Sequence, residues 1–284
     1  KGGRDVMKKK RNYMHKSNWW KYLLAVVIVI FHVLPLYVLV VMAFKTKTDM
    51  SSLLTIPNYF YPDNFIKIFK KGEILNAFKN TAIVTVCVLF LEIVAGGLAS
   101  YPLARNKSKW NQFISSVFMG IMMIPSLSIL VGVYSLLVSI HGISTLWGLI
   151  LVSVAFGLPM TIYLYTNFIN AIPESLDEAS AIDGCNVFQS FFKIILPQLK
   201  PVTVTVLILN GVGIWNEYAY GLYILQKPKT YTLTLMISQY FSTGGKDFNG
   251  AAAAACIAIM PIVIAYICLQ KYFIQGTIDS AVKG

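Results

Sequence analysis

The chain has 284 residues, of which 56% are hydrophobic and 13% are charged, and its formal net charge is +12. Soluble globular domains usually have about a quarter of their residues charged, so this composition excludes an ordinary soluble domain and indicates an integral membrane protein. The positive charge is densest before residue 22, where attraction to anionic lipid explains it, and we expect no nucleic-acid partner.

Six apolar segments predict six membrane-spanning helices, because hydrocarbon cannot satisfy an open backbone and these segments lack the alternation of barrel strands. The segments are Tyr22 to Phe44, Thr81 to Tyr101, Phe113 to Ser139, Ile143 to Ile172, Val202 to Leu225 and Gly250 to Leu269. We therefore predict an all-α integral membrane protein, with a basic amino-terminal segment, 1–21, and a single transmembrane domain, 22–284.

The distribution of Lys and Arg predicts the orientation of these helices. The basic residues before the first span lie on the same side as Arg105, Lys107 and Lys109, and the positive-inside rule assigns that side to the cytoplasm. Six spans place both termini there and leave the segments 45–80 and 226–249 outside. The six Lys of segment 45–80 run against this assignment, but the alternation of the other loops outweighs them.

Glu92 is a rare acidic residue within a predicted span, where an ionisable group must face a cavity or a partner. Small residues follow it, among them Ala95, Gly96 and Ala99, and they favour close helix packing. We therefore expect the Glu92 carboxylate to bond a neighbouring helix rather than a substrate.

Residues 173–201 form a polar and aromatic interruption between the fourth and fifth apolar segments, and they predict two short helices joined at a corner. Pro173 suits the first position of the first helix, where Glu174 and Asp177 complement the positive end of the helix dipole. Gly184 provides a left-handed residue that ends this helix.

The second helix is predicted to begin at Asn186 as its cap and to end at Pro197. Its large apolar residues share one helical face: Phe188, Phe191, Phe192 and Ile195. The first helix has small residues that let another backbone approach closely: Ala179, Ser180 and Ala181. An exposed stripe of Phe indicates either a partner groove or a loop that folds back under its own bundle, and the residues alone leave both open.

This segment, which we call the EAA loop, resembles the EAA motif of binding-protein-dependent ABC importer permeases, EAAxxDG followed after nine residues by IxLPxxxP. The spacing is kept, and Ser180 replaces the second alanine. In that family the segment is a coupling helix pair seated in a cleft of the ATP-hydrolysing subunit, so the resemblance implies the same docking here. The residues assigned to ATPase coupling are Glu178, Ala179, Ser180, Asp183, Gly184, Phe188, Phe191, Phe192, Ile194, Leu196 and Pro197.

The fifth predicted span contains a second acidic residue, Glu217, within a polar and aromatic cluster. The run 215–218, WNEY, looks like a signature of carbohydrate-uptake permeases, and the tail 270–284 is similar to theirs. Aromatic rings stack on sugars and amides bond their hydroxyls, so the cluster predicts a lining of the transport pathway, with structural bonding between helices as the alternative. The pathway candidates are Asn210, Trp215, Asn216, Glu217 and Tyr218.

The resemblance implies the smaller permease subunit of a maltose-type importer, with a five-helix core and a cytoplasmic coupling helix pair, in a prokaryotic cytoplasmic membrane. Its implied partners are a second permease subunit, two ATP-binding subunits that use ATP and Mg, and an external solute-binding protein that loop 226–249 faces, although this loop also reads as an ordinary surface loop. The chain has no GxxxxGK[ST] motif, so we expect it to bind no ATP. Its cysteines show no Cys/His metal spacing and no nucleophile, base or metal set converges, so we expect no metal, no other cofactor and a non-catalytic chain.

The implied cargo is a carbohydrate, with an oligosaccharide favoured. Two alternatives stay open. One is an ABC permease for a non-sugar solute, against which the WNEY run and the tail argue. The other is a secondary transporter that relays ions through Glu92 and Glu217, for which the EAA loop has no use.

Overall fold

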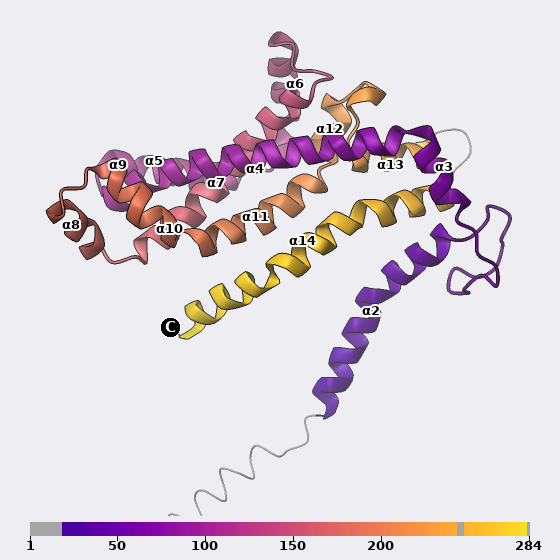
Figure 1. The fold of residues 1–284 in the computed structure, drawn as a ribbon. Helices are drawn as coiled ribbons and strands as arrows, with labels where there is room; N and C mark the ends of the chain where they lie inside the picture. Colours follow the sequence, from indigo (N-terminus) through magenta and orange to yellow (C-terminus); the bar gives the residue numbers. More distant parts are fainter. Residues whose placement is uncertain (1–18, 243–246, 283–284) are drawn as a thin grey trace, which may run out of the picture.

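The computed structural model describes residues 19–242 and 247–282, which form helices with no strand among them (Figure 1). The predicted all-α fold class is therefore confirmed. The basic residues 1–18 lie outside the described residues, as do most side chains of the tail 270–284.

Four helices are each long and apolar enough to span a membrane. They are α2 (Trp19–Ala43), α4 (Glu73–Arg105), α7 (Leu146–Asn170) and the first part of α14 (Phe248–Val282). Two bent pairs also qualify: α5 (Lys109–Met122) with η1 (Ser126–Ile129) and α6 (Leu130–Ser139), and the helical segment 187–198 with α11 (Lys200–Trp215). The described chain thus has four candidate spans, or six when each bent pair counts as one.

The third predicted span, 113–139, is not one straight helix. Its two parts meet at 93°, and α6 projects away from the rest of the bundle (Figure 1). Pro125 lies at the break. Proline lacks an amide hydrogen and disfavours helical backbone in the residue before it, so the bend falls where the helix cannot continue.

The fifth predicted span, 202–225, is also interrupted. α11 ends at Trp215, and a separate short helix, α12 (Ala219–Ile224), follows it. A 68° bend separates α11 from the helical segment before it.

The two loops predicted to lie outside contain helices that the apolar segments did not predict. Loop 45–80 contains α3 (Asp63–Lys71), which Gly72, with φ of 69°, separates from α4. Loop 226–249 contains η3 (Pro228–Thr230) and α13 (Leu233–Ser242). These helices lie together at one end of the bundle, which we call the α3 end (Figure 1).

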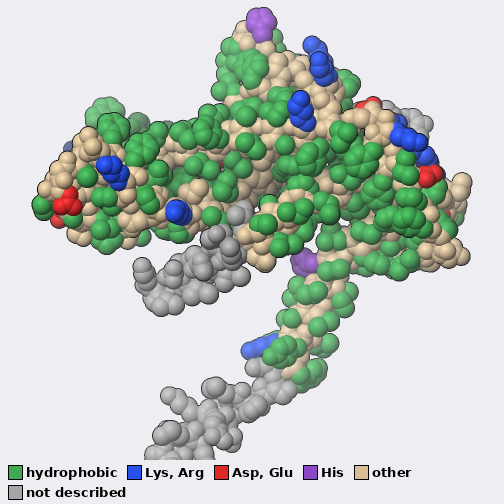
Figure 2. Space-filling model, in the orientation of Figure 1, with side chains coloured by type: hydrophobic (Ala, Val, Ile, Leu, Met, Phe, Trp, Pro, Cys, Tyr) green, Lys and Arg blue, Asp and Glu red, His purple; other side chains and the backbone are tan. Residues whose placement is uncertain are grey.

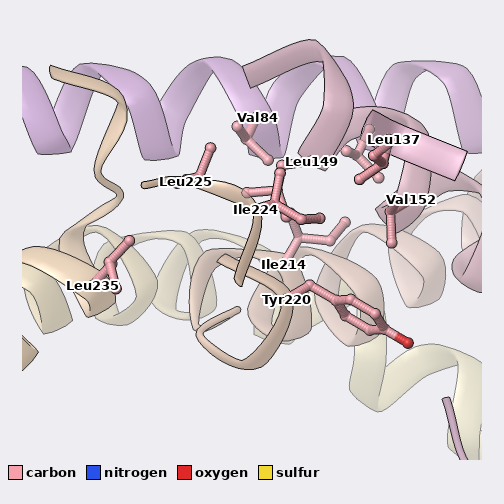
Figure 3. Packing of buried hydrophobic residues seen from close by; sticks show 10 residues of the cluster. Val84, Leu137, Leu149, Val152, Ile214, Tyr220, Ile224, Leu225 and Leu235 are labelled. Carbon is pink, nitrogen blue, oxygen red and sulfur yellow. The ribbon is translucent and has the colours of Figure 1, made fainter. Parts of the chain in front are cut away.

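The centre of the bundle consists of α4 and α7, which lie side by side, with α11 packed against both (Figure 1). Buried aliphatic side chains from these helices and from α12 meet in one cluster, among them Val84, Leu149, Val152, Ile214 and Ile224 (Figure 3). In water, burial of each such side chain stabilises a fold by about 1.5–3 kcal/mol. In lipid, the close packing of the side chains stabilises the fold instead.

α2 contributes little to this core. The apolar side chains of α2 are mostly exposed up to Leu36, and the carboxyl end of α2 contacts α14. Hydrophobic side chains also cover much of the visible face of the molecule (Figure 2). Such a surface requires lipid or another apolar subunit around it.

Candidate functional site

The EAA loop has the predicted form of two helical segments and a corner. α8 (Ser175–Ile182) begins two residues after Pro173, with Glu174 as its N-cap. Gly184 follows it with φ of 81°, which confirms the expected left-handed residue. Asn186 and Gln189 form a reciprocal capping box at the start of the second segment, so this cap is confirmed as well.

The second segment is less regular than predicted. It comprises α9 (Val187–Ser190), a π-helical turn η2 (Phe191–Ile195) and α10 (Leu196–Gln198). The prediction that Pro197 ends the helix is wrong, because Pro197 lies inside α10. In the π-helical turn that precedes Pro197, each amide bonds the carbonyl five residues earlier instead of four. The helix can therefore continue through Pro197 although proline has no amide hydrogen for the usual bond to the carbonyl four residues earlier.

The apolar stripe of this segment is divided between two sides. Phe191 and Ile195 are 4% and 0% exposed and pack with Tyr101 and Tyr165 at the ends of α4 and α7. Phe188 and Phe192 point outward and are 73% and 51% exposed. The prediction that these four residues share one face is therefore wrong, because the segment lies flat against the bundle and only its outer half remains free.

The outward side of the EAA loop combines apolar residues from both segments. We call this surface the outer face: Ile182, Val187, Phe188 and Phe192. The coupling residues Glu178, Ala179, Asp183, Leu196 and Pro197 are also exposed, and Ile194 is half-buried. A side chain at Gly184 would meet no atom within 4 Å, so glycine is favoured there by its backbone angle and not by crowding within the chain.

Ser180 does not lie on this surface. It is 2% exposed, and its hydroxyl contacts Ser190 Oγ at 2.8 Å and donates to the Asp177 carbonyl at 2.7 Å. The expectation that Ser180 lets an outside backbone approach is wrong, because its side chain fastens α8 to α9.

Asp177 joins the EAA loop to the bundle. Its carboxylate accepts from Arg105 Nε at 2.9 Å and from Tyr101 Oη at 2.6 Å, both at the end of α4. Arg105 also donates from Nη1 to the Ile169 carbonyl of α7 at 3.0 Å. From the sequence, Asp177 is assigned only to the positive end of the helix dipole. Its pairing with Arg105 is not predicted, since no local pattern relates residues 72 positions apart.

The buried polar residues of the bundle centre meet across three helices. Asn210 of α11 donates from Nδ2 to Glu92 Oε2 of α4 at 2.6 Å and to Thr161 Oγ1 of α7 at 2.9 Å. Glu92 is 1% exposed, and its carboxylate occupies the space that a Cβ at Gly157 would need. The expected interhelical bond of Glu92 is confirmed, and Asn210 is its partner.

The other pathway candidates lie at the junction of α11 and α12, and their hydrogen bonds go to other partners than those of Asn210. Glu217 accepts the Tyr220 and Gly221 amides at 2.7 and 2.9 Å and so caps α12. Trp215 donates from Nε1 to the Ala258 carbonyl of α14 at 3.0 Å. Asn216 and Tyr218 are exposed, and a pathway role stays a prediction for them.

At the α3 end the loops 45–80 and 226–249 contact one another. Lys47 forms an ion pair with Asp247 at 2.9 Å, and Asn76 donates to the Lys229 carbonyl at 2.7 Å. A cavity of about 710 Å³ opens between these loops. Its charged lining residues are Lys47, Lys71, Lys229, Glu73 and Asp247, and its aromatic ones are Tyr231 and Tyr240.

The chain matches the family model of the binding-protein-dependent transport system inner membrane component over residues 92–279. It is 37% identical to the melibiose/raffinose/stachyose import permease protein MelC of Bacillus subtilis, in an alignment that covers 92% of this chain and 95% of that protein. It is 34% identical to the probable starch degradation products transport system permease protein AmyC of Thermoanaerobacterium thermosulfurigenes, over 95% and 100% of the two chains.

Among solved structures, the fold is similar to a chain of a bacterial ABC transporter involved in the import of the acidic polysaccharide alginate. The TM-score is 0.77 at 18% sequence identity, over 91% of this chain and 98% of that one. A chain of the MetNI methionine ABC transporter has a TM-score of 0.61 at 18% identity, over 72% and 96%. At such identity the likeness concerns the fold alone.

Proposed function

The chain belongs to the family of binding-protein-dependent transport system inner membrane components, and we propose that it forms half of the translocation pathway of an ATP-driven importer for oligosaccharides. The observation that carries this proposal is the EAA loop, which presents an apolar outer face and is tied to the bundle through Asp177 and Arg105. A free apolar face of this kind fits a groove on another protein.

The cargo class is supported by the relatives, whose names specify melibiose, raffinose and stachyose, starch degradation products, and arabinooligosaccharides. All of these cargoes are uncharged carbohydrates. We therefore favour an oligosaccharide over the amino acids and ions that other ABC importers carry.

In this proposal two partner ATPase subunits bind ATP and Mg and carry out all hydrolysis, and this chain is non-catalytic. Each ATPase holds the outer face of an EAA loop in a groove. When the ATPases close, the loop moves as one body with the ends of α4 and α7, because Arg105 bonds both Asp177 and the Ile169 carbonyl. The helices then alternate between two arrangements that expose the pathway to opposite sides.

The EAA loop and both termini are assigned to the cytoplasm, and the α3 end to the outer side. The cavity at the α3 end, with its three Lys and two Tyr, then faces the solute-binding protein. The exposed apolar surfaces of α2 and of the α5–α6 bend are assigned to lipid and to the second permease subunit.

The test is reconstitution of the chain with its second permease subunit, its ATPase and its solute-binding protein in proteoliposomes. Raffinose, maltotriose and an arabinooligosaccharide serve as cargo, with methionine as the non-sugar control. We expect uptake of at least one sugar that requires both ATP and the binding protein. Uptake without the ATPase that follows a proton or sodium gradient would replace this proposal with a secondary transporter, and uptake of methionine alone would replace the cargo class.

A further inference from the structure

A second cavity lies at the EAA-loop end of the bundle, between the carboxyl end of α4, α5 and the last turns of α7. Its volume is about 360 Å³, within the roughly 300–1,000 Å³ typical of small-molecule sites. Its polar lining comes from α5, from α7 and from the turn after α4, and includes Asn106, Ser115, Tyr163, Thr166, Asn167 and Asn170.

Part of this polar lining already has partners within the chain. Asn111 donates from Nδ2 to the Pro102 and Asn106 carbonyls at 2.9 and 2.8 Å, and Ser116 donates to the Gln112 carbonyl at 2.9 Å. The two Asn111 bonds hold the start of α5 against the end of α4. The cavity wall is therefore a built feature of the fold.

Five other polar side chains of the wall have no partner among the described residues. They are the side chains of Ser115, Tyr163, Thr166, Asn167 and Asn170. The hydroxyl of Thr166 is unpaired and has almost no accessible surface, which is unfavourable by about 1–3 kcal/mol. A bound group supplies the missing hydrogen bond only when the neighbouring side chains shift to expose this hydroxyl.

The composition of the wall selects the chemistry of a ligand. Lys107 is the one charged residue among the described lining residues, and it is engaged with Glu174 at 3.3 Å. Unpaired amides and hydroxyls can bond the hydroxyls of a neutral ligand. The side chain of Tyr163 is 40% exposed, and its ring offers an apolar face on which a ligand can stack. Such a wall on α5 and α7, both parts of candidate spans, does not suit hydrocarbon and requires an aqueous path.

We infer that this cavity is a binding site for a neutral oligosaccharide at the EAA-loop end of the pathway, where cargo is held before it leaves the subunit. The inference rests on the proposed function, because it assigns a site to the same cargo. A sugar present on that side competes for the site, so it slows further uptake.

The test uses the purified complex of both permease subunits with the ATPase, without the binding protein, and equilibrium binding of radiolabelled raffinose. Thr166→Val removes the unpaired hydroxyl at nearly constant volume, and Asn167→Leu removes the amide. We expect each to raise the Kd for raffinose about fivefold, as the loss of one neutral hydrogen bond predicts. Thr205→Val is the matched control, since the Thr205 hydroxyl donates to the Pro201 carbonyl of its own helix at 3.2 Å, outside the cavity.

Equal Kd values in the wild type and both cavity variants overturn the inference, as does the absence of saturable raffinose binding. If raffinose binds to the second permease subunit and not to this cavity, the Kd values are also equal, and the inference is overturned in the same way. Uptake in proteoliposomes is measured with the same permease and ATPase preparations after the solute-binding protein has been added. If ATP-driven sugar uptake persists while the Kd values are equal, only this inference fails, whereas absent uptake of every sugar with intact binding removes the proposed function.

Discussion

Arg105, the last residue of α4, and Asp177, in the first turn of α8, form an ion pair with 2.9 Å between Nε and Oδ2. Their side chains are 13% and 20% exposed, so water screens the pair only in part. The bond links the EAA loop to α4, a helix that is not adjacent to it in sequence. In the proposed mechanism, movement of the loop is therefore passed to α4 as well as to α7 and α11.

Asp177→Asn should uncouple transport from ATP hydrolysis. The variant keeps the shape of the side chain but removes the charge that holds Arg105, and leaves a guanidinium partly buried without a counter-ion, a loss of about 2 kcal/mol. We expect the ratio of sugar transported to ATP hydrolysed to fall at least about fivefold in proteoliposomes.

Glu174→Gln is the matched control for this change, one turn earlier in the chain. Glu174 forms an ion pair with Lys107, and the two side chains are 59% and 73% exposed, respectively. Removal of this exposed pair should leave the ratio of sugar transported to ATP hydrolysed nearly unchanged. Equal ratios for Asp177→Asn and the wild type would show that the ion pair does not transmit motion.

Phe191→Ala and Phe192→Ala should impair different properties although the residues are adjacent. Phe191 is buried beside Tyr101 at 5.3 Å between ring centroids, so its truncation should destabilise the chain by about 3 kcal/mol. Phe192 lies on the outer face, so its truncation should weaken association with the ATPase and leave the melting temperature of the permease unchanged.

Thermal unfolding of the permease pair in detergent and retention of the ATPase on an affinity column separate these two effects. Each variant is the control for the other. If Phe192→Ala retains the ATPase as well as the wild type does, then the outer face is not the docking surface.

Gly184→Val should impair assembly with the ATPase, whereas Gly184→Asn should be tolerated. Gly184 has φ of 81°, a left-handed conformation that costs an ordinary L-residue about 1–2 kcal/mol and a β-branched one more, while Asn adopts it readily. The corner that joins α8 to α9 should therefore change only in the valine variant. Crosslinking of a cysteine at Ala179 to the ATPase groove measures this, and equal yields in both variants would contradict the argument.

Gly157→Ala should destabilise the bundle centre. The added methyl would overlap the Glu92 carboxylate and displace it from Asn210, which is unfavourable by about 2 kcal/mol. Gly97→Ala is the control on the neighbouring helix, because a methyl there meets no atom within 4 Å. We expect a lower melting temperature in detergent for Gly157→Ala alone, and a similar drop in both variants would indicate a general effect of alanine in these helices.

The sequence by itself determined the features that depend on neighbouring residues. Apolar segments too long for a soluble core predicted the spans, because the length of a helix that crosses hydrocarbon depends on the bilayer alone. Gly184 and Asn186 predicted the corner of the EAA loop, because left-handed backbone and helix capping are properties of single residues.

The tertiary structure alone decided which side chains meet. The bonds from Arg105 to Asp177 and from Asn210 to Glu92 join residues 72 and 118 positions apart, and no helical period relates them. The division of the Phe stripe depended in the same way on where the ends of α4 and α7 lie. Helical periodicity places residues on one face of a helix, but the packing of distant helices determines how much of that face is buried.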